Sequence, residues 1–158
     1  MPFTILAVGK QREPFYAQAM QEYLRRLSRY CKITVKEIQD EKEPDTRSEA
    51  LLQKAIEAEG ERLMSAIRDQ DFVIALCIDA PQKTSEEFSE LISAWHNRSV
   101  SAVFVIGGSN GLSEKVIKRA DMKLSLSNMT LPHQLARVIL LEQIYRSFKI
   151  ISGERYHK

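Results

Sequence analysis

Apolar residues along the chain follow two spacings, one typical of strands and the other of helices. Short apolar or alternating runs predict strands at residues 3–9, 31–38, 71–78, 102–106 and 123–127. Apolar residues spaced three or four positions apart predict helices at residues 15–30, 48–68, 85–96, 113–120 and 132–151. This alternation is typical of an α/β protein with a largely parallel sheet and helices on both of its faces.

Three local features refine this picture. The run at 71–78 and the strand at 102–106 are apolar without alternation, as expected of central strands covered on both faces. Ser85, Ser113, and either Thr130 or Leu131 are expected to cap the helices that follow them. The last helix is apolar around most of its girth, so we expect it to be buried on two sides, one of them against a second subunit.

Composition bounds the class of protein. The chain has 158 residues, 44% of them hydrophobic and 28% charged, which predicts a single domain over residues 1–158. No apolar run approaches the roughly 20 residues that cross a bilayer, and the apolar start predicts a first strand and not a signal peptide. Cys31 and Cys77 form no CxxC pair, which is consistent with a reducing, cytoplasmic location.

Charge gives little information about partners. The net charge of +2 is weak evidence for a nucleic-acid partner. Basic residues nevertheless gather near the end of the first helix and at the C-terminus, the first group being Arg25, Arg26, Arg29 and Lys32 and the second Arg146, Lys149, Arg155, His157 and Lys158. A solvated helix face explains the first group equally well.

Two loops at strand ends carry the candidate chemistry. The strand at 102–106 runs into Gly107-Gly108-Ser109-Asn110-Gly111, which is neither the dinucleotide fingerprint nor a P-loop. A polar bend at 127–130 follows the last strand. Ligands of parallel sheets bind beyond the carboxyl ends of strands, so the two loops predict one pocket that holds a ligand by backbone groups. Two tight turns without a ligand are the alternative.

Other kinds of site have no support in the sequence. His96, His133 and His157 lack metal-ligand spacing, so we expect no metal. No G-x-S-x-G elbow is present to support a serine triad. The last helix does carry polar residues four positions apart, His133 with Arg137 and Glu142 with Arg146, and such pairs share a face.

These segments together resemble the RlmH (YbeA-like) family of SPOUT methyltransferases. The resemblance is carried by the loop from Gly107 to Leu112 and by four further segments, which are Leu124-Ser125-Leu126-Ser127, Thr130-Leu131-Pro132-His133-Gln134, Tyr145-Arg146 and Tyr156-His157-Lys158. It extends over essentially the whole chain. The combination of loop, T-L-P-H segment and tail is specific, whereas each part alone is not.

The resemblance implies a fold, a cofactor and a reaction. The C-terminal part would form a deep trefoil knot, a rare exception to unknotted topology. The cofactor would be S-adenosylmethionine, and the protein would be a cytoplasmic homodimer. Its substrate would be the assembled ribosome, where it would methylate N3 of a pseudouridine in helix 69 of 23S rRNA.

The resemblance also implies site residues. Leu76 would line the adenosine pocket, and Gly107 and Gly108 would let the cofactor lie against the backbone. The remaining cofactor contacts would be main-chain groups of Leu126, Ser127, Asn128, Met129, Thr130, Leu131 and Pro132.

The reaction requires a proton to leave N3 before that nitrogen can attack a methyl group. His133 is a candidate base because of its pKa range. Arg137, Arg146 or His157 would stabilise charge or hold phosphate. The tail with Tyr156 and His157 would fold over an active site, either that of its own chain or that of the partner subunit. The alternatives are a flavodoxin-like nucleotide-binding enzyme and a non-enzymatic ribosome-associated factor.

Overall fold

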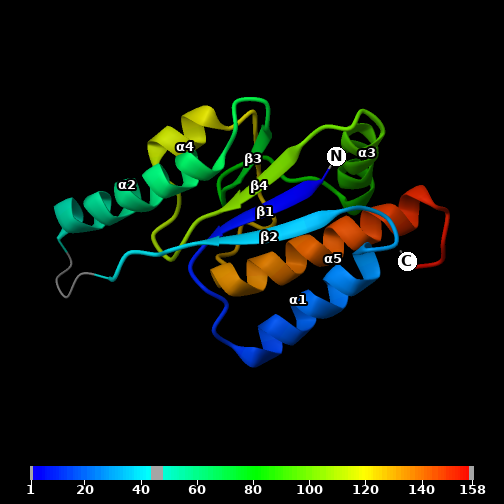
Figure 1. The fold of residues 1–158 in the computed structure, drawn as a ribbon, viewed down its shortest axis with the longest axis horizontal. Coiled ribbons are helices and arrows are strands. Elements are labelled where there is room, and N and C mark those ends of the chain that lie inside the picture. The colour runs from blue at the N-terminus through cyan, green and yellow to red at the C-terminus, as the bar shows by residue number, and fades with distance from the viewer. Residues whose placement is uncertain (1, 44–47, 157–158) are drawn as a thin grey trace.

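The computed structural model describes residues 2–43 and 48–156 and shows a five-stranded, wholly parallel sheet between two layers of helices (Figure 1). The strand order is β2-β1-β4-β3-β5. The strands are β1 (Phe3–Val8), β2 (Ile33–Ile38), β3 (Phe72–Leu76), β4 (Ala102–Ile106) and β5 (Met122–Leu124). The helices are α1 (Pro14–Leu27), α2 (Glu49–Ala66), α3 (Ser85–Asn97), α4 (Glu114–Arg119) and α5 (His133–Ile151). The predicted α/β class is confirmed.

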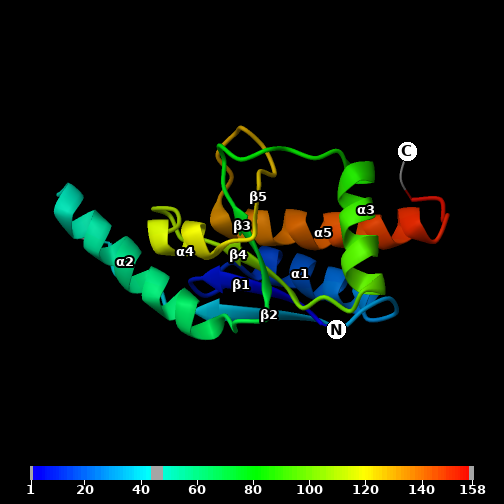
Figure 2. The ribbon, with the colours of Figure 1, turned by 90° about the horizontal axis from the view of Figure 1, so that it is seen from above.

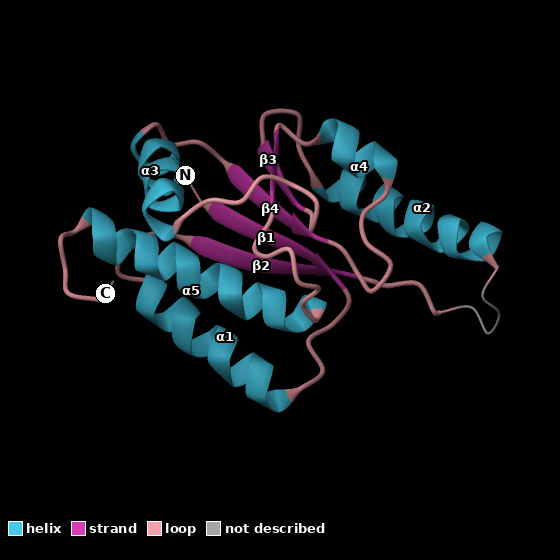
Figure 3. Cartoon of the chain, turned by 180° about the vertical axis from the view of Figure 1, so that it is seen from behind, coloured by secondary structure: helices cyan, strands magenta, loops and turns pink. Residues whose placement is uncertain are grey.

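The central strands divide their side chains between two cores, because successive side chains of a strand point to opposite faces. Phe3, Ile5 and Phe104 pack with α1, α3 and α5, which cover one face. Leu6 and Val105 pack with α2 and α4 on the other face. Figure 3 shows the first group of helices in front of the sheet, with α2 and α4 lying to one side. The continuous apolar run of β4 is thereby explained, since all five of its residues are buried.

The apolar girth of α5 has an explanation within one chain. This helix packs against α1 on one flank, α3 on the other and the sheet beneath (Figure 3). Leu140, Leu141 and Ile144 are completely buried by these neighbours. The pattern therefore does not require a second subunit to cover the helix, and dimerisation stays a prediction.

The helix caps correct two expectations. Ser113 caps α4 as expected, accepting a hydrogen bond from the Val116 N–H. In α3 the cap is Thr84 and not Ser85, because Thr84 and Glu87 form a reciprocal capping box. The N-cap of α5 is Pro132, one residue after Leu131 and two after Thr130, the two expected caps, and no side chain bonds to the helix start there.

The segment after β5 leaves the sheet earlier than the sequence predicts. β5 ends at Leu124, and Ser125 bonds instead to the connection between β3 and α3, its N–H donating to the Pro81 carbonyl (3.0 Å) and its hydroxyl to the Ile78 carbonyl (2.9 Å). Figure 2 shows these two connections approaching each other above the sheet. The trefoil knot stays a prediction. No helix in the described ranges is long and apolar enough to cross a membrane.

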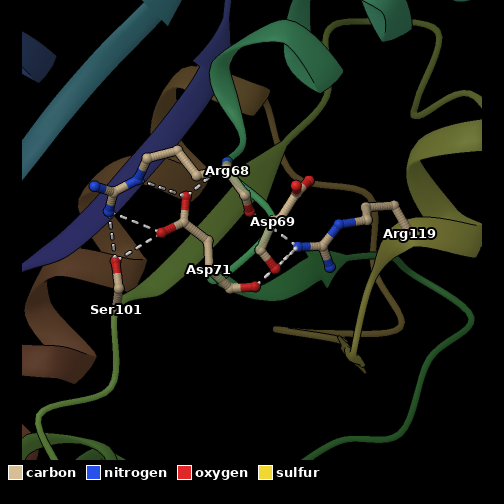
Figure 4. Close-up of polar contacts among 5 residues, drawn as sticks. All are labelled: Arg68, Asp69, Asp71, Ser101 and Arg119. Atoms are coloured by element: carbon tan, nitrogen blue, oxygen red, sulfur yellow. Dashed lines mark hydrogen bonds and ion pairs between the residues drawn. The ribbon is translucent and has the colours of Figure 1, made fainter.

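A polar network ties the amino ends of β3 and β4 together (Figure 4). Asp71, which is 5% exposed, accepts hydrogen bonds from the Arg68 guanidinium (2.9 Å) and the Ser101 hydroxyl (2.8 Å). Arg119 donates to the carbonyls of Arg68, Asp69 and Asp71. In a parallel sheet this edge lies opposite the carboxyl edge, so we assign the network a structural role.

Candidate active site

A large cavity lies where β3, β4 and β5 end. All three strands are parallel, so their carboxyl ends meet at one edge, and the loops that follow enclose about 720 Å³. This volume lies within the range of small-molecule sites. The wall is formed by residues from all three loops and the first turns of α5, namely Leu76, Cys77, Ile78, Asp79, Ile106, Gly107, Gly108, Ser109, Gly111, Leu112, Ile117, Leu126, Ser127, Met129, Thr130, Leu131, Pro132, His133 and Ala136.

Nearly all residues expected to hold the cofactor line this cavity. Only Asn128 is absent from its wall, as an exposed residue of the bend. Sequence reasoning missed Cys77, Ile78 and Asp79, which directly follow β3. The end of a central apolar strand was the available signal, because a residue after such a strand reaches the same edge as the two predicted loops.

The glycines of the first loop serve its internal packing. A Cβ at Gly107 would lie 2.8 Å from the carbonyl carbon of Gly111, and a Cβ at Gly108 would lie 3.2 Å from Val8. Of the loop glycines, Gly111 has a positive φ of 84°. The close approach of the loop to itself at Gly107, and to the end of β1 at Gly108, therefore accounts for the two glycines, and close approach of a ligand is not needed to explain them.

The second loop is held by short-range hydrogen bonds. The Ser125 hydroxyl, which shares its one proton between the carbonyls of Ile78 (2.9 Å) and Ser127 (3.0 Å), ties this loop to the connection after β3. The Ser127 hydroxyl accepts a hydrogen bond from the Met129 N–H (3.0 Å). Two large apolar side chains remain exposed beside the cavity, Met129 at 77% and Ile78 at 48%. This mouth is consequently apolar, whereas Asp79 supplies a carboxylate in the wall.

His133 stands between two cavities. It lines the large one and also a smaller one of about 240 Å³ formed by the loops after β1, β2 and β4. Burial lowers the pKa of His133, and the nearby charge of Arg137 lowers it further. The imidazole is therefore neutral at pH 7 and can donate or accept a hydrogen bond there.

Arg137 lies inside the protein, away from solvent. Its side chain is completely buried, and its guanidinium donates to the Val8 carbonyl (2.9 Å), the Gly9 carbonyl (2.7 Å) and the Glu37 carboxylate (3.0 Å). Only Nε lacks a partner within the described chain. Arg137 thus joins α5 to the ends of β1 and β2, and in this arrangement its Nη atoms are not available to an RNA phosphate.

Arg146 and Tyr156 lie together at the other end of α5. The Arg146 guanidinium donates to Glu142 (2.6 Å) and lies 4.7 Å from the centre of the Tyr156 ring, while the Tyr156 hydroxyl donates to the same carboxylate (3.2 Å). Burial and Glu142 raise the pKa of Tyr156 to about 12. Thirteen helical positions separate His133 from Arg146, which is about 20 Å. One chain therefore does not bring these groups together, and His157 lies outside the described residues.

Comparisons with known proteins agree with this geometry. A family model described as "Predicted SPOUT methyltransferase" matches residues 1–157. Proteins named "Ribosomal RNA large subunit methyltransferase H" from Bifidobacterium animalis subsp. lactis and Carboxydothermus hydrogenoformans are each 50% identical over the full length of both chains. A protein of the same name from Listeria monocytogenes is 46% identical, also over the full length.

A solved structure supports the fold at low identity. "The structure of a probable methylase family protein from Haemophilus influenzae Rd KW20" superposes with a TM-score of 0.54 and 13% identity, covering 96% of this chain and 66% of that one. The parallel sheet, the cavity at its carboxyl edge and the family model together define a SPOUT methyltransferase. The full-length identities narrow this class, and the chain belongs to the RlmH family.

Proposed function

We propose that this protein transfers the methyl group of S-adenosylmethionine to N3 of a pseudouridine in helix 69 of 23S rRNA. It acts on assembled ribosomes in the cytoplasm, as a homodimer. Membership of a methyltransferase family supports the reaction class, and the names of the full-length relatives support large-subunit rRNA as the substrate. The flavodoxin-like alternative has no support from these relatives. The nucleotide and its ring position come from the resemblance of the sequence motifs.

The large cavity is the observation that carries this proposal. Its volume of about 720 Å³ fits a ligand of the size of S-adenosylmethionine, and its apolar walls, which include Leu76, Ile106 and Ala136, suit an adenine ring. The Asp79 carboxylate in the same wall suits a ligand that carries a sulfonium and an ammonium charge. The residues present therefore fit this cofactor. When bound, it supplies an activated methyl group.

The residues of the chain then have to orient the two reactants and exclude water. The backbone of residues 126–132 would hold the adenine and methionine parts, and the wall from Leu76 to Asp79 would close the opposite side. Neutral His133, on the boundary of the two cavities, contacts the target base by a hydrogen bond.

The homodimer supplies the groups that one chain leaves distant. Arg146 lies about 20 Å along α5 from His133, and Tyr156 packs against Arg146, so within a single chain neither reaches the large cavity. In the dimer, the C-terminal tail of the partner subunit covers the site, and its basic residues contact the RNA backbone. Measuring the mass in solution at micromolar concentration tests this step, and a monomer would contradict it.

Calorimetry with S-adenosylmethionine, followed by transfer of labelled methyl groups to ribosomes that lack the modification, tests the proposed function. We expect binding, one methyl group per ribosome, and no transfer to naked rRNA fragments. Asp79→Asn should weaken cofactor binding about fivefold, the effect of roughly 1 kcal/mol for one partly solvated charge contact. The matched control is Asp69→Asn at the opposite edge of the sheet. Absence of both binding and transfer would refute the enzymatic function.

A further inference from the structure

The smaller cavity is built against the same wall as the large one. It lies between the loops after β1, β2 and β4, and it shares Gly108, Ser109 and His133 with the large cavity. Its volume of about 240 Å³ equals that of about eight water molecules at ~30 Å³ each. A pyrimidine ring with its two carbonyl oxygens has a comparable number of heavy atoms, whereas an adenosine is too large. The two cavities therefore match two reactants of different size.

Glu59 of α2 lies buried in the wall of the smaller cavity. It is 7% exposed, and one carboxylate oxygen accepts a hydrogen bond from the Glu41 N–H (3.0 Å). Both oxygens lie 3.6 Å from the position that a Cβ on Gly108 would take, directly behind the wall that the cavities share. No salt bridge of the described residues includes Glu59. Buried carboxylates are costly without a cationic partner, so this group calls for a functional explanation.

The polar groups of this cavity match the edge of a uracil-like ring. Such an edge presents an N–H donor flanked by two carbonyl acceptors. Glu59 provides an acceptor for the N–H, and Arg12 and His133, which line the same cavity, provide donors for the carbonyl oxygens. The separate cluster of acidic side chains in the loop after β2 is not needed for this match.

We infer that the smaller cavity receives the target pyrimidine ring and that Glu59 is the catalytic base. This inference rests on the proposed function. The Glu59 carboxylate takes the proton of the ring N–H, and the electron pair of that bond stays on the ring. The nitrogen then forms a bond to the methyl carbon of the donor. The carbon–sulfur bond breaks and its electron pair stays on sulfur, so charge and atoms balance.

The electrostatic surroundings favour Glu59 over His133 as the base. Burial raises the pKa of Glu59; the Glu41 N–H and Arg62 oppose this shift, and the charges of Asp40 and Glu41 add to it. The pKa of His133 is lowered by burial and by Arg137. A base works best when its pKa lies near the working pH. The two shifts move the pKa of Glu59 toward pH 7 and the pKa of His133 away from it. The remaining charged groups of this cavity are Arg12, Lys42 and Glu43.

Single-turnover methylation of ribosomes by three variants tests this assignment. Glu59→Gln keeps the shape and the acceptor for the Glu41 N–H but cannot take the proton, so the rate should fall at least 100-fold, the usual effect of a general base. Glu59→Asp, which restores a carboxylate, should recover part of the rate. Glu57→Gln, on the exposed side of the same helix, should match the wild type. Calorimetry should show unchanged binding of S-adenosylmethionine in all three.

Two measurements separate catalysis from structure. The wild-type rate should rise with pH until Glu59 is ionised, and Glu59→Gln should lose this limb. Independently of activity, the ¹³C resonance of the Glu59 carboxyl should titrate above about 4.3, the ordinary value for glutamate. A titration at or below that value, or a Glu59→Gln rate within threefold of the wild type, would overturn the assignment while the proposed function stands. An inactive wild type would instead refute the proposed function.

Discussion

Replacement of Arg137 by Met should destabilise the protein strongly, because this side chain joins three elements from a fully buried position. Met keeps most of the apolar stem and removes the hydrogen bonds to Val8, Gly9 and Glu37. Removing one partner of a buried ion pair costs about 3–5 kcal/mol. Glu37 is 34% exposed and can be rehydrated, so we expect the lower part of that range, about 3–4 kcal/mol.

Urea unfolding followed by circular dichroism measures this loss. For a chain of this length, about 3–4 kcal/mol corresponds to a fall in Tm of about 6–16 °C. Arg25→Met is the matched control, because Arg25 is 66% exposed and its ion pair with Glu22 lies at the surface. Its effect should stay within about 0.5 kcal/mol. A loss below about 1 kcal/mol for Arg137→Met would show that the buried contacts do not anchor α5.

Three further outcomes follow from the structure. Burial alone would raise the pKa of Asp71, but the hydrogen bonds from Arg68 and Ser101 outweigh it and lower the pKa. Ionised Asp71 therefore stabilises the folded protein above about pH 4, and this stabilisation is lost as pH falls below that value. When the free energy of unfolding is measured from about pH 3 to 7, it should depend less on pH in Asp71→Asn than in the wild type. Burial raises the pKa of both cysteines, that of Cys31 to about 12, and of the two it is Cys77 that lines the large cavity. S-adenosylmethionine should therefore slow alkylation of Cys77, and Cys31 should stay unmodified at pH 8 by mass spectrometry. Deleting residues 156–158 should abolish methyl transfer and leave the circular dichroism spectrum unchanged; retained activity would contradict the role of the tail.

The strand and helix pattern was accessible from the sequence because it depends on local periodicity. The apolar run of β4 and the stripe of α1 state which positions are buried, whatever their partners are. The cavity loops were accessible for a related reason. Parallel strands end at one edge, so the loops after β4 and β5 had to lie at the same edge once the sheet was known to be parallel. The strand order, in which only β3 separates β4 from β5, then brings both loops to one cavity.

Other features depend on contacts between distant segments. Arg137 shares a helix face with His133, which predicts a second polar site residue, but the ends of β1 and β2 enclose its guanidinium. Glu59 lies on a helix rich in charged residues and has no local feature that separates it from its exposed neighbours. It becomes buried because the loops after β2 and β4 both cover it.

The sequence by itself determined the class of fold, the loops that meet at the carboxyl edge and the family, since these follow from periodicity and from motifs that are continuous in the chain. Only the tertiary structure decided which polar groups stay accessible. Burial is a property of the space between elements, and that space is defined by strand order and helix packing, which no single segment encodes.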